Sequence, residues 1–283
     1  MISFFFTSLF IFWAIFGSFA SVLIWRIKSG EHGIITGRSH CPKCQHILWF
    51  LDLFPILSYV CLGGKCRYCQ EKISPIYPIL EVMTGVLFVL SGYFLVDYNL
   101  LLTGSTIEIV KLGFFLSIAL ISIVYVFYDI LFMEIPDEVL IPANLILFWL
   151  LFLVSTGIQL PIFWHFLPFQ NEVLNIPIIN ALLGAFGIFA FFYFQIYISD
   201  GKWMGGWDLR IALFMWLVGG AKIAALGLLL AYFVGSIIGI GILLYNRNRN
   251  TEVPFGPYLA VGLYLSLFWY TPIVAWYTKL FTL

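Results

Sequence analysis

Charged residues are scarce in this sequence: only 10% of its 283 residues are Asp, Glu, Lys or Arg, whereas 62% are hydrophobic. Both fractions lie far from those of an ordinary soluble globular domain, which excludes that class. The first apolar stretch also lacks a basic segment before it and a small-residue cleavage site after it, so we expect a retained span and not a cleaved signal. The formal net charge is zero and by itself indicates nothing about partners. We expect a lipid bilayer and no nucleic acid among them.

Apolar stretches long enough to cross a hydrocarbon core, about 20 residues each, follow one another along the chain. They predict an all-α polytopic membrane protein with about eight transmembrane helices. The sixth expected span is short and is separated from the seventh by Gly219 and Gly220, which favours a tilted or re-entrant segment. The expected spans are residues 2–26, 75–96, 108–128, 139–159, 176–199, 209–219, 222–245 and 257–280.

Basic residues gather on one side of this layout, and the positive-inside rule places that side in the cytoplasm. Eleven of the 14 basic residues lie there: Arg26, Lys28, Arg38, Lys43, Lys65, Arg67, Lys72, Lys202, Arg210, Arg247 and Arg249. We therefore expect the N-terminus outside and cytoplasmic loops at residues 27–74, 129–138, 200–208 and 246–256. The first of these loops is the only hydrophilic segment large enough to form a small domain.

Two CxxC pairs lie in that loop, Cys41 with Cys44 and Cys66 with Cys69, and 21 residues separate them. Four thiolates in two such pairs are typical of a closed tetrahedral zinc site with a structural role. Two local disulfides are the alternative, but a reducing cytoplasm disfavours them. His46 in place of one thiolate is a second alternative. In so small a loop, a metal would replace the hydrophobic core.

Three carboxylates lie inside or at the edge of expected spans, where ionisable groups are costly and indicate function. Asp129 ends the third span, Asp208 opens the sixth, and Glu81 lies inside the second. Two spans separate Asp129 from the 200–208 loop, so Asp129 and Asp208 reach the same membrane face. Two adjacent carboxylates share a proton, one acting as base on water and the other as acid, which is the chemistry of an aspartic protease. Such a pair titrates as a unit, so base and acid are not assigned to individual residues.

Each aspartate also has a structural interpretation. An Asp at a helix start is a good N-cap and an Asp at a span end is simply solvated, and Asp137 after Pro136 fits the start of the fourth span. Gly205 and Gly206, before Asp208, would let a substrate backbone approach closely. A proton-coupled transporter that uses Asp129, Asp208 and Glu81 as a relay is the rival from another class.

Taken together, short motifs along nearly the whole chain resemble the bacterial type IV prepilin peptidases, bifunctional enzymes with peptidase and N-methyltransferase activities. The matching pieces occur in the family's order: Gly17-Ser-Phe19 followed by Arg26, both CxxC pairs, Pro55-Ile-Leu-Ser-Tyr59, Gly63-Gly-Lys-Cys66, Tyr77-Pro-Ile-Leu-Glu81, Tyr128-Asp129 through Ile135-Pro-Asp137, and Pro254-Phe-Gly-Pro-Tyr-Leu-Ala260. Each piece alone is modest, and the set together is specific.

The resemblance implies a GxGD-type aspartyl protease core with a zinc-ribbon-like loop. Asp129 matches the family's first catalytic aspartate, eight residues before Asp137 of its Pro-Asp pair, and Asp208 matches the aspartate of its GxGD motif. The implied location is the bacterial inner membrane with the active site facing the cytoplasm. The implied substrates are prepilins of type IV pili and pseudopilins of type II secretion systems. The expected domains are the first helix at 1–26, the zinc loop at 27–74, a methyltransferase-like region over 1–96, and a peptidase domain at 97–283.

Two positions depart from the family pattern. Trp207 stands where the motif has glycine before the aspartate, so reshaped specificity, a shift of the effective glycine to Gly205 or Gly206, and a catalytically weakened zinc-binding assembly protein all stay open. Ser21 stands where the first-span motif usually has Asn. The resemblance also implies S-adenosylmethionine as cofactor, although no glycine-rich dinucleotide fingerprint is present. Glu81 is a candidate participant in methyl transfer, with a buried structural glutamate as the alternative.

Overall fold

The computed structural model describes residues 2–30, 37–155, 177–200, 205–246 and 253–281. This described part is helical and contains no β-strand, only two isolated bridges in the cysteine loop. The predicted all-α class is therefore confirmed. The longer helices are α1 (Ile2–Ser29), α3 (Ile76–Leu95), α5 (Thr106–Phe132), α6 (Asp137–Ser155), α8 (Pro177–Ser199), α9 (Asp208–Asn246) and α10 (Gly256–Phe281). The short ones are η1 (Phe50–Leu53), α2 (Leu57–Cys61) and α4 (Tyr98–Leu102).

Five segments of the described residues are long and apolar enough to cross a membrane, which supports a multi-pass membrane protein. They are Leu9–Ser29, Ile76–Leu95, Thr106–Phe132, Asp208–Tyr245 and Gly256–Leu280. The fourth combines the expected sixth and seventh spans. Gly220 interrupts it with non-helical backbone angles (φ 70°, ψ −178°) at the expected glycine pair. Glycine tolerates this positive φ because it has no Cβ.

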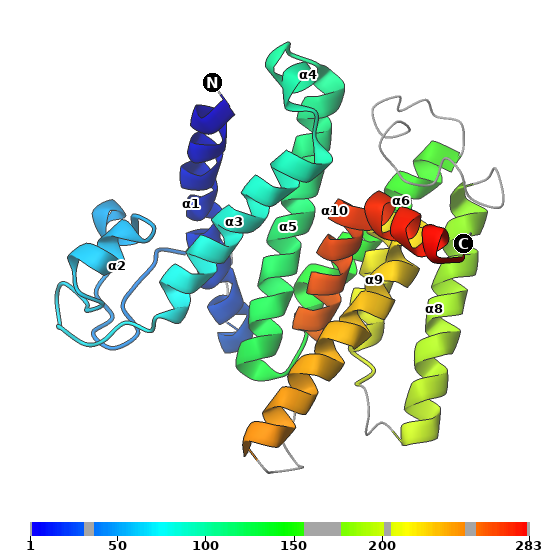
Figure 1. The fold of residues 1–283 in the computed structure, drawn as a ribbon. Coiled ribbons are helices and arrows are strands. Elements are labelled where there is room, and N and C mark those ends of the chain that lie inside the picture. Colours follow the sequence, from blue (N-terminus) through cyan, green and yellow to red (C-terminus); the bar gives the residue numbers. More distant parts are fainter. Residues whose placement is uncertain (1, 31–36, 156–176, 201–204, 247–252, 282–283) are drawn as a thin grey trace. The chain divides into compact units, whose positions relative to one another are not determined.

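The chain divides into two compact units. The first unit holds residues 1–103 and 112–127, and the second holds residues 104–111 and 128–283. In the first unit, α1 packs along α3 (Figure 1). A Cβ at Gly17 would lie 2.7 Å from the Cα of Glu81, so glycine here permits a close approach of the two helices.

The second unit is built around α9, which packs against α6, α8 and α10 (Figure 1). Ala212 and Ala224 of α9 are fully buried beside Phe192 of α8 and form the unit's apolar core. A Cβ at Gly262 of α10 would overlap the carbonyl oxygen of Gly227. Small residues therefore bring the backbones of α9 and α10 together, as is common where helices associate in a membrane.

Helix ends in the second unit position its acidic residues. Helix α5 stops at Met133, which adopts the left-handed conformation and donates its N–H to the Asp129 carbonyl at 2.8 Å. Pro136 then precedes the first residue of α6, Asp137, where an acidic side chain favours a helix start. Asp208 is likewise the first residue of α9. All three aspartates therefore lie at helix termini.

Candidate functional site

The four predicted cysteine ligands form one cluster. The sulfurs of Cys41, Cys44, Cys66 and Cys69 all lie within 4.8 Å of one another, and the Cys41 and Cys69 sulfurs are 3.9 Å apart. Zinc bound to four thiolates at about 2.3 Å in a tetrahedron places its sulfurs about 3.8 Å apart. The donor set and its spacing fit a zinc ion, and the residues that would hold it are these four cysteines.

Each CxxC pair is held by the same backbone turn. The N–H groups of Cys41 and Cys66 each donate to the carbonyl five residues further along, at 3.0 and 2.8 Å. Gln45 and Gln70 follow the second cysteine of each pair, adopt positive φ angles of 57° and 60°, and donate their N–H groups back to the carbonyls of Cys41 and Cys66. The two turns form a duplicated knuckle, as in a zinc ribbon, and orient two sulfurs apiece toward one point.

Electrostatics within the cluster favour a bound cation. Burial opposes ionisation of Cys41, but the backbone N–H groups of Cys44 and Lys43 lower its pKa to about 7. The backbone N–H of Glu71 favours the Cys69 thiolate, yet burial and the neighbouring sulfurs raise its pKa to about 12. Four adjacent thiolates repel one another, so the cluster ionises fully only when a metal compensates the charge.

Both alternatives for the cysteines lose support in this geometry. The five cysteines are free thiols and no disulfide joins them. The imidazole of His46 packs against the Tyr68 ring with a centroid distance of 3.7 Å and an interplanar angle of 35°, and the sulfur cluster does not include it. Tyr68 in turn donates its hydroxyl to Asp52, which pairs with Arg67 at 2.8 Å. His46 therefore belongs to a side-chain network beside the cluster.

The second unit brings Asp129 and Asp208 together in a buried place. Only 6% of Asp129 and 8% of Asp208 is exposed. The N–H of Gly256, the first residue of α10, donates to Asp129 Oδ2 at 2.8 Å. A Cβ at Gly256 would lie 2.6 Å from that oxygen and 3.2 Å from Ile211, which lies in the first turn of α9 after Asp208. The carboxyl groups of Asp129 and Asp208 lie close enough to interact electrostatically. The end of α5 and the starts of α9 and α10 thus converge around the two carboxyl groups.

Asp137 has a partner of its own. It forms an ion pair with the guanidinium group of Arg210. The same guanidinium lies 4.7 Å from the centroid of the Trp207 ring, which is half exposed. A cation over an indole face is an attractive arrangement. Trp207, Arg210 and Asp137 therefore form one connected group at the start of α9.

The two glycines before Trp207 differ in their surroundings. A Cβ at Gly206 would meet nothing within 4 Å, so this position is open. A Cβ at Gly205 would lie 3.2 Å from the Trp207 ring and 3.9 Å from Asp208 Oδ2. The Gly205 carbonyl also accepts the N–H of Asp208 at 3.2 Å. Gly205 therefore adjoins the carboxyl pair directly.

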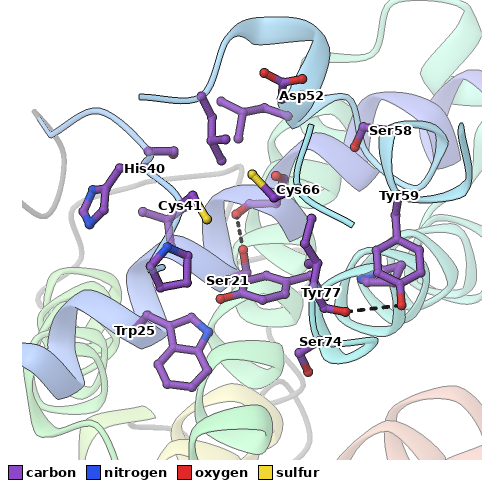
Figure 2. Close-up of a pocket in the computed structure, with 18 of the residues that line it drawn as sticks. Ser21, Trp25, His40, Cys41, Asp52, Ser58, Tyr59, Cys66, Ser74 and Tyr77 are labelled. Atoms are coloured by element: carbon purple, nitrogen blue, oxygen red, sulfur yellow. Dashed lines mark hydrogen bonds between the residues drawn. The ribbon is translucent and has the colours of Figure 1, made fainter. Parts of the chain in front are cut away.

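Glu81 lies in the first unit and is buried, with 8% of its surface exposed. Its Oε2 accepts the backbone N–H of Ile56 at 2.8 Å, so the glutamate joins α3 to the cysteine loop. Glu81 also lines a cavity of about 540 Å³. Ser21 lines the same cavity and donates its hydroxyl to the carbonyl of Ser18 at 2.7 Å (Figure 2). Both residues therefore have polar partners inside one protein unit.

Sequence reasoning missed Gly256 as part of the site. The segment around it was recognised as a family motif, but no role followed from it, because a backbone N–H carries no side-chain signature. The signal was present in two prolines: Pro254 and Pro257 enclose the glycine and favour a helix start. A helix start leaves N–H groups free to bind a carboxylate.

Comparisons with known proteins match a family model to the N-terminal part of the chain and relatives to most of its length. Residues 11–95 match the family model described as the bacterial peptidase A24 N-terminal domain. A prepilin leader peptidase/N-methyltransferase of Bacillus subtilis is 31% identical over 274 residues, covering 96% of this chain and 97% of the relative. Proteins with the same name from Aeromonas salmonicida and Pseudomonas aeruginosa are 30% and 28% identical, covering 87% and 89% of this chain and 76% and 78% of their own lengths. No solved structure matches.

Proposed function

Because the chain belongs to the family of prepilin leader peptidase/N-methyltransferases, we propose that it removes the leader peptide from prepilins and pseudopilins and then methylates the new N-terminus. The observation that carries the peptidase assignment is the convergence of Asp129, Asp208 and the Gly256 N–H in one buried place. The geometry supplies two carboxyl groups and a fixed donor. That combination suits peptide hydrolysis by an aspartic mechanism.

In the proposed reaction, Asp129 and Asp208 share one proton. The ionised carboxyl group takes a proton from a water molecule as that water attacks the scissile carbonyl carbon. The protonated carboxyl group donates a hydrogen bond to the carbonyl oxygen and stabilises the negative charge that develops there. Collapse of the tetrahedral intermediate breaks the C–N bond, and the leaving amine takes up the proton that the pair received from water, so the pair again shares one proton. Burial of both groups strengthens these interactions relative to water.

The residues before Asp208 have a supporting role in this proposal. Gly205 and the open position at Gly206 leave room for an extended substrate backbone beside the carboxyl pair. The Trp207 ring is held against Arg210, which Asp137 fixes through its ion pair. We therefore propose that Gly205 and Gly206 allow the close backbone approach that the glycine of the family motif allows. Trp207 forms a wall that contacts the substrate.

Substrate and membrane placement follow from the same proposal. A prepilin carries a basic leader next to an apolar helix, so the scissile bond lies where the helix leaves the bilayer. Asp129 ends a membrane-spanning segment and Asp208 begins another, which suits that boundary. We propose that the protein lies in the bacterial inner membrane, with its N-terminus outside and the carboxyl pair facing the cytoplasm.

Methylation is assigned to the N-terminal part of the chain, residues 1–96, with S-adenosylmethionine as the methyl donor. Zinc in the cysteine loop, residues 27–74, has a structural role, and residues 97–283 form the peptidase domain. The cysteine cluster lies within the region that the family model matches, residues 11–95. Its four thiolates leave no open coordination position for a substrate, which favours a structural over a catalytic metal.

We expect Gly256→Ala to lower kcat for leader release about 100-fold. The new Cβ would lie 2.6 Å from Asp129 Oδ2, so the carboxyl group or the start of α10 has to move, and a displacement of about 1 Å in a catalytic group costs rate on that order. Steady-state kinetics on a prepilin peptide measure the effect. Gly239→Ala is the matched control, because nothing lies within 4 Å of a Cβ there. Equal rates for both variants would contradict the proposed role of the Gly256 N–H.

The proposed activity itself is tested with the full-length protein in lipid vesicles and a peptide that joins a basic leader to an apolar segment. We expect wild-type protein to release the leader, detected by mass spectrometry of the two products. Trp207→Gly restores the motif glycine and serves as the comparison. No release by wild-type protein together with release by Trp207→Gly would show a weakened peptidase and overturn the proposal. No release by either would favour the zinc-binding assembly protein.

A further inference from the structure

A polar pair joins α8 to α9 in the second unit, and the hydrolysis proposed above gives it no role. Tyr232 of α9 donates its hydroxyl to Oε1 of Gln195 on α8 at 2.7 Å. Every other residue between positions 191 and 198 of α8 is aromatic or aliphatic. A polar side chain in such a segment of a membrane protein is costly, so it indicates either helix association or function.

The α9 member of this pair lies beside the carboxyl groups. The ring centroid of Tyr232 is 5.3 Å from that of Phe255, the residue before Gly256. The N–H of Gly256 in turn holds the carboxyl group of Asp129. Tyr232 and Asp208 also lie close enough to interact electrostatically. The polar pair therefore reaches from the surroundings of the two carboxyl groups to α8.

The α8 member of the pair keeps hydrogen-bond donors to spare. A glutamine amide has an acceptor oxygen and two N–H groups, and the contact with Tyr232 uses only the oxygen. Gln195 is partly exposed, and no acceptor for its Nε2 lies among the residues that the structure describes. An amide that lacks an acceptor in apolar surroundings is costly. The two N–H groups are therefore available to a ligand at this surface.

A prepilin that is being cleaved needs donors at such a place. In the proposed substrate the scissile bond lies where an apolar helix leaves the bilayer. The segment has to unwind before the carboxyl groups can reach its scissile carbonyl, and unwinding removes the helical N–H partners of its backbone carbonyl groups. Carbonyl groups without partners are costly at the edge of the bilayer. Gln195 lies four residues before Ser199, the end of α8, which suits the same boundary.

We infer that Gln195 is a substrate-binding residue, an inference that rests on the leader release proposed above. Its side-chain N–H groups donate to backbone carbonyl oxygens of the unwound prepilin segment beside the scissile bond. Tyr232 is a positioning residue, because its hydroxyl occupies Oε1 and leaves Nε2 for the substrate. Recognition of the backbone suits both prepilins and pseudopilins, since the amide contacts no substrate side chain.

Steady-state kinetics of leader release by full-length protein in lipid vesicles test this role. Gln195→Met keeps the length of the side chain and removes its donors. We expect KM to rise about fivefold, the loss typical of one neutral hydrogen bond. We expect kcat to stay within a factor of about two, because the bound substrate and the transition state make the same contact. Tyr197→Phe is the matched control, because it removes a hydroxyl from the same helix at a residue that is 74% exposed.

A second background separates substrate binding from helix association. In Tyr232→Phe protein the hydrogen bond between α8 and α9 is already absent, so Gln195→Met then removes only the donors. We expect KM to rise about threefold or more in that background too. Thermal unfolding of each variant reports what the interhelical hydrogen bond contributes to stability. A lower Tm with unchanged KM in both backgrounds would show a purely structural pair and overturn the inference.

Photo-crosslinking locates the contact independently of stability. Asp129→Asn protein should hold a peptide substrate without cleaving it, and a diazirine beside the scissile bond should label α8 within residues 191–198. A label confined to other helices would overturn the inference and leave the peptidase in place. Absence of leader release by wild-type protein would instead remove the proposed function, and this inference with it.

Discussion

Asp129→Asn and Asp208→Asn should each reduce leader release about 10³-fold or more. Each substitution is nearly isosteric and removes the only proton-transfer capacity of that side chain. General acid and base contributions are worth about 10²–10⁴-fold, and the two carboxyl groups act as a unit. The double variant should therefore be no slower than either single one. Initial rates on a prepilin peptide, with the new N-terminus identified by sequencing, measure the effect.

Glu138→Gln is the control for these variants. Glu138 lies in the first turn of α6, one residue after Asp137, and is exposed, so loss of its charge should leave the rate within a factor of about two, as expected for a surface substitution. Circular dichroism and thermal unfolding confirm that the variants keep their helices. Leader release at the wild-type rate in either Asn variant would remove that aspartate from the mechanism.

Convergence of the two aspartates could be predicted because it depends only on counting. Two spans between Asp129 and the 200–208 loop return the chain to the same face, whatever the packing. The cysteine cluster could also be predicted, because CxxC spacing is a local property of the sequence. Both predictions rest on side-chain type and chain order. Neither prediction requires knowing which distant segments contact each other in the fold.

The features that escaped prediction are contacts between segments. The sequence shows that Trp207 replaces the motif glycine but not where its ring lies. The Trp207 ring lies 4.7 Å from the guanidinium group of Arg210, and Arg210 in turn forms an ion pair with Asp137. The Gly256 N–H, 127 positions away from Asp129 in the chain, is invisible for a related reason. Sequence patterns report on faces and termini of single helices, whereas pairings across helices follow from packing.

The cavity in the first unit is another feature that sequence patterns do not predict. Glu81 was identified as costly in a span and therefore as a functional candidate. Its carboxylate accepts the N–H of Ile56, which has a φ of 62°, and no periodicity or spacing predicts a positive φ at an isoleucine. The sequence therefore identified Glu81 as a candidate but did not show that Glu81 lines a cavity.

Removal of the metal should unfold the cysteine loop while the second unit keeps its helices. Neither η1 nor α2 contains a buried residue, so the loop has little apolar core to retain its fold. Structural zinc contributes about 10–16 kcal/mol in zinc-finger peptides, far more than so small a segment gains from packing. A chelator, or Cys66→Ser, should therefore abolish amide protection at Cys41 and Cys66, whose N–H groups form the knuckle hydrogen bonds.

Hydrogen exchange with mass spectrometry measures this loss, and elemental analysis measures zinc. We expect one zinc per chain in wild-type protein and in Cys61→Ser, because Cys61 is exposed and lies outside the cluster, and none in Cys66→Ser. Unchanged protection in a zinc-free loop would contradict a structural metal. The same treatment should leave protection in α9 and α10 intact, because those helices pack against each other without the loop.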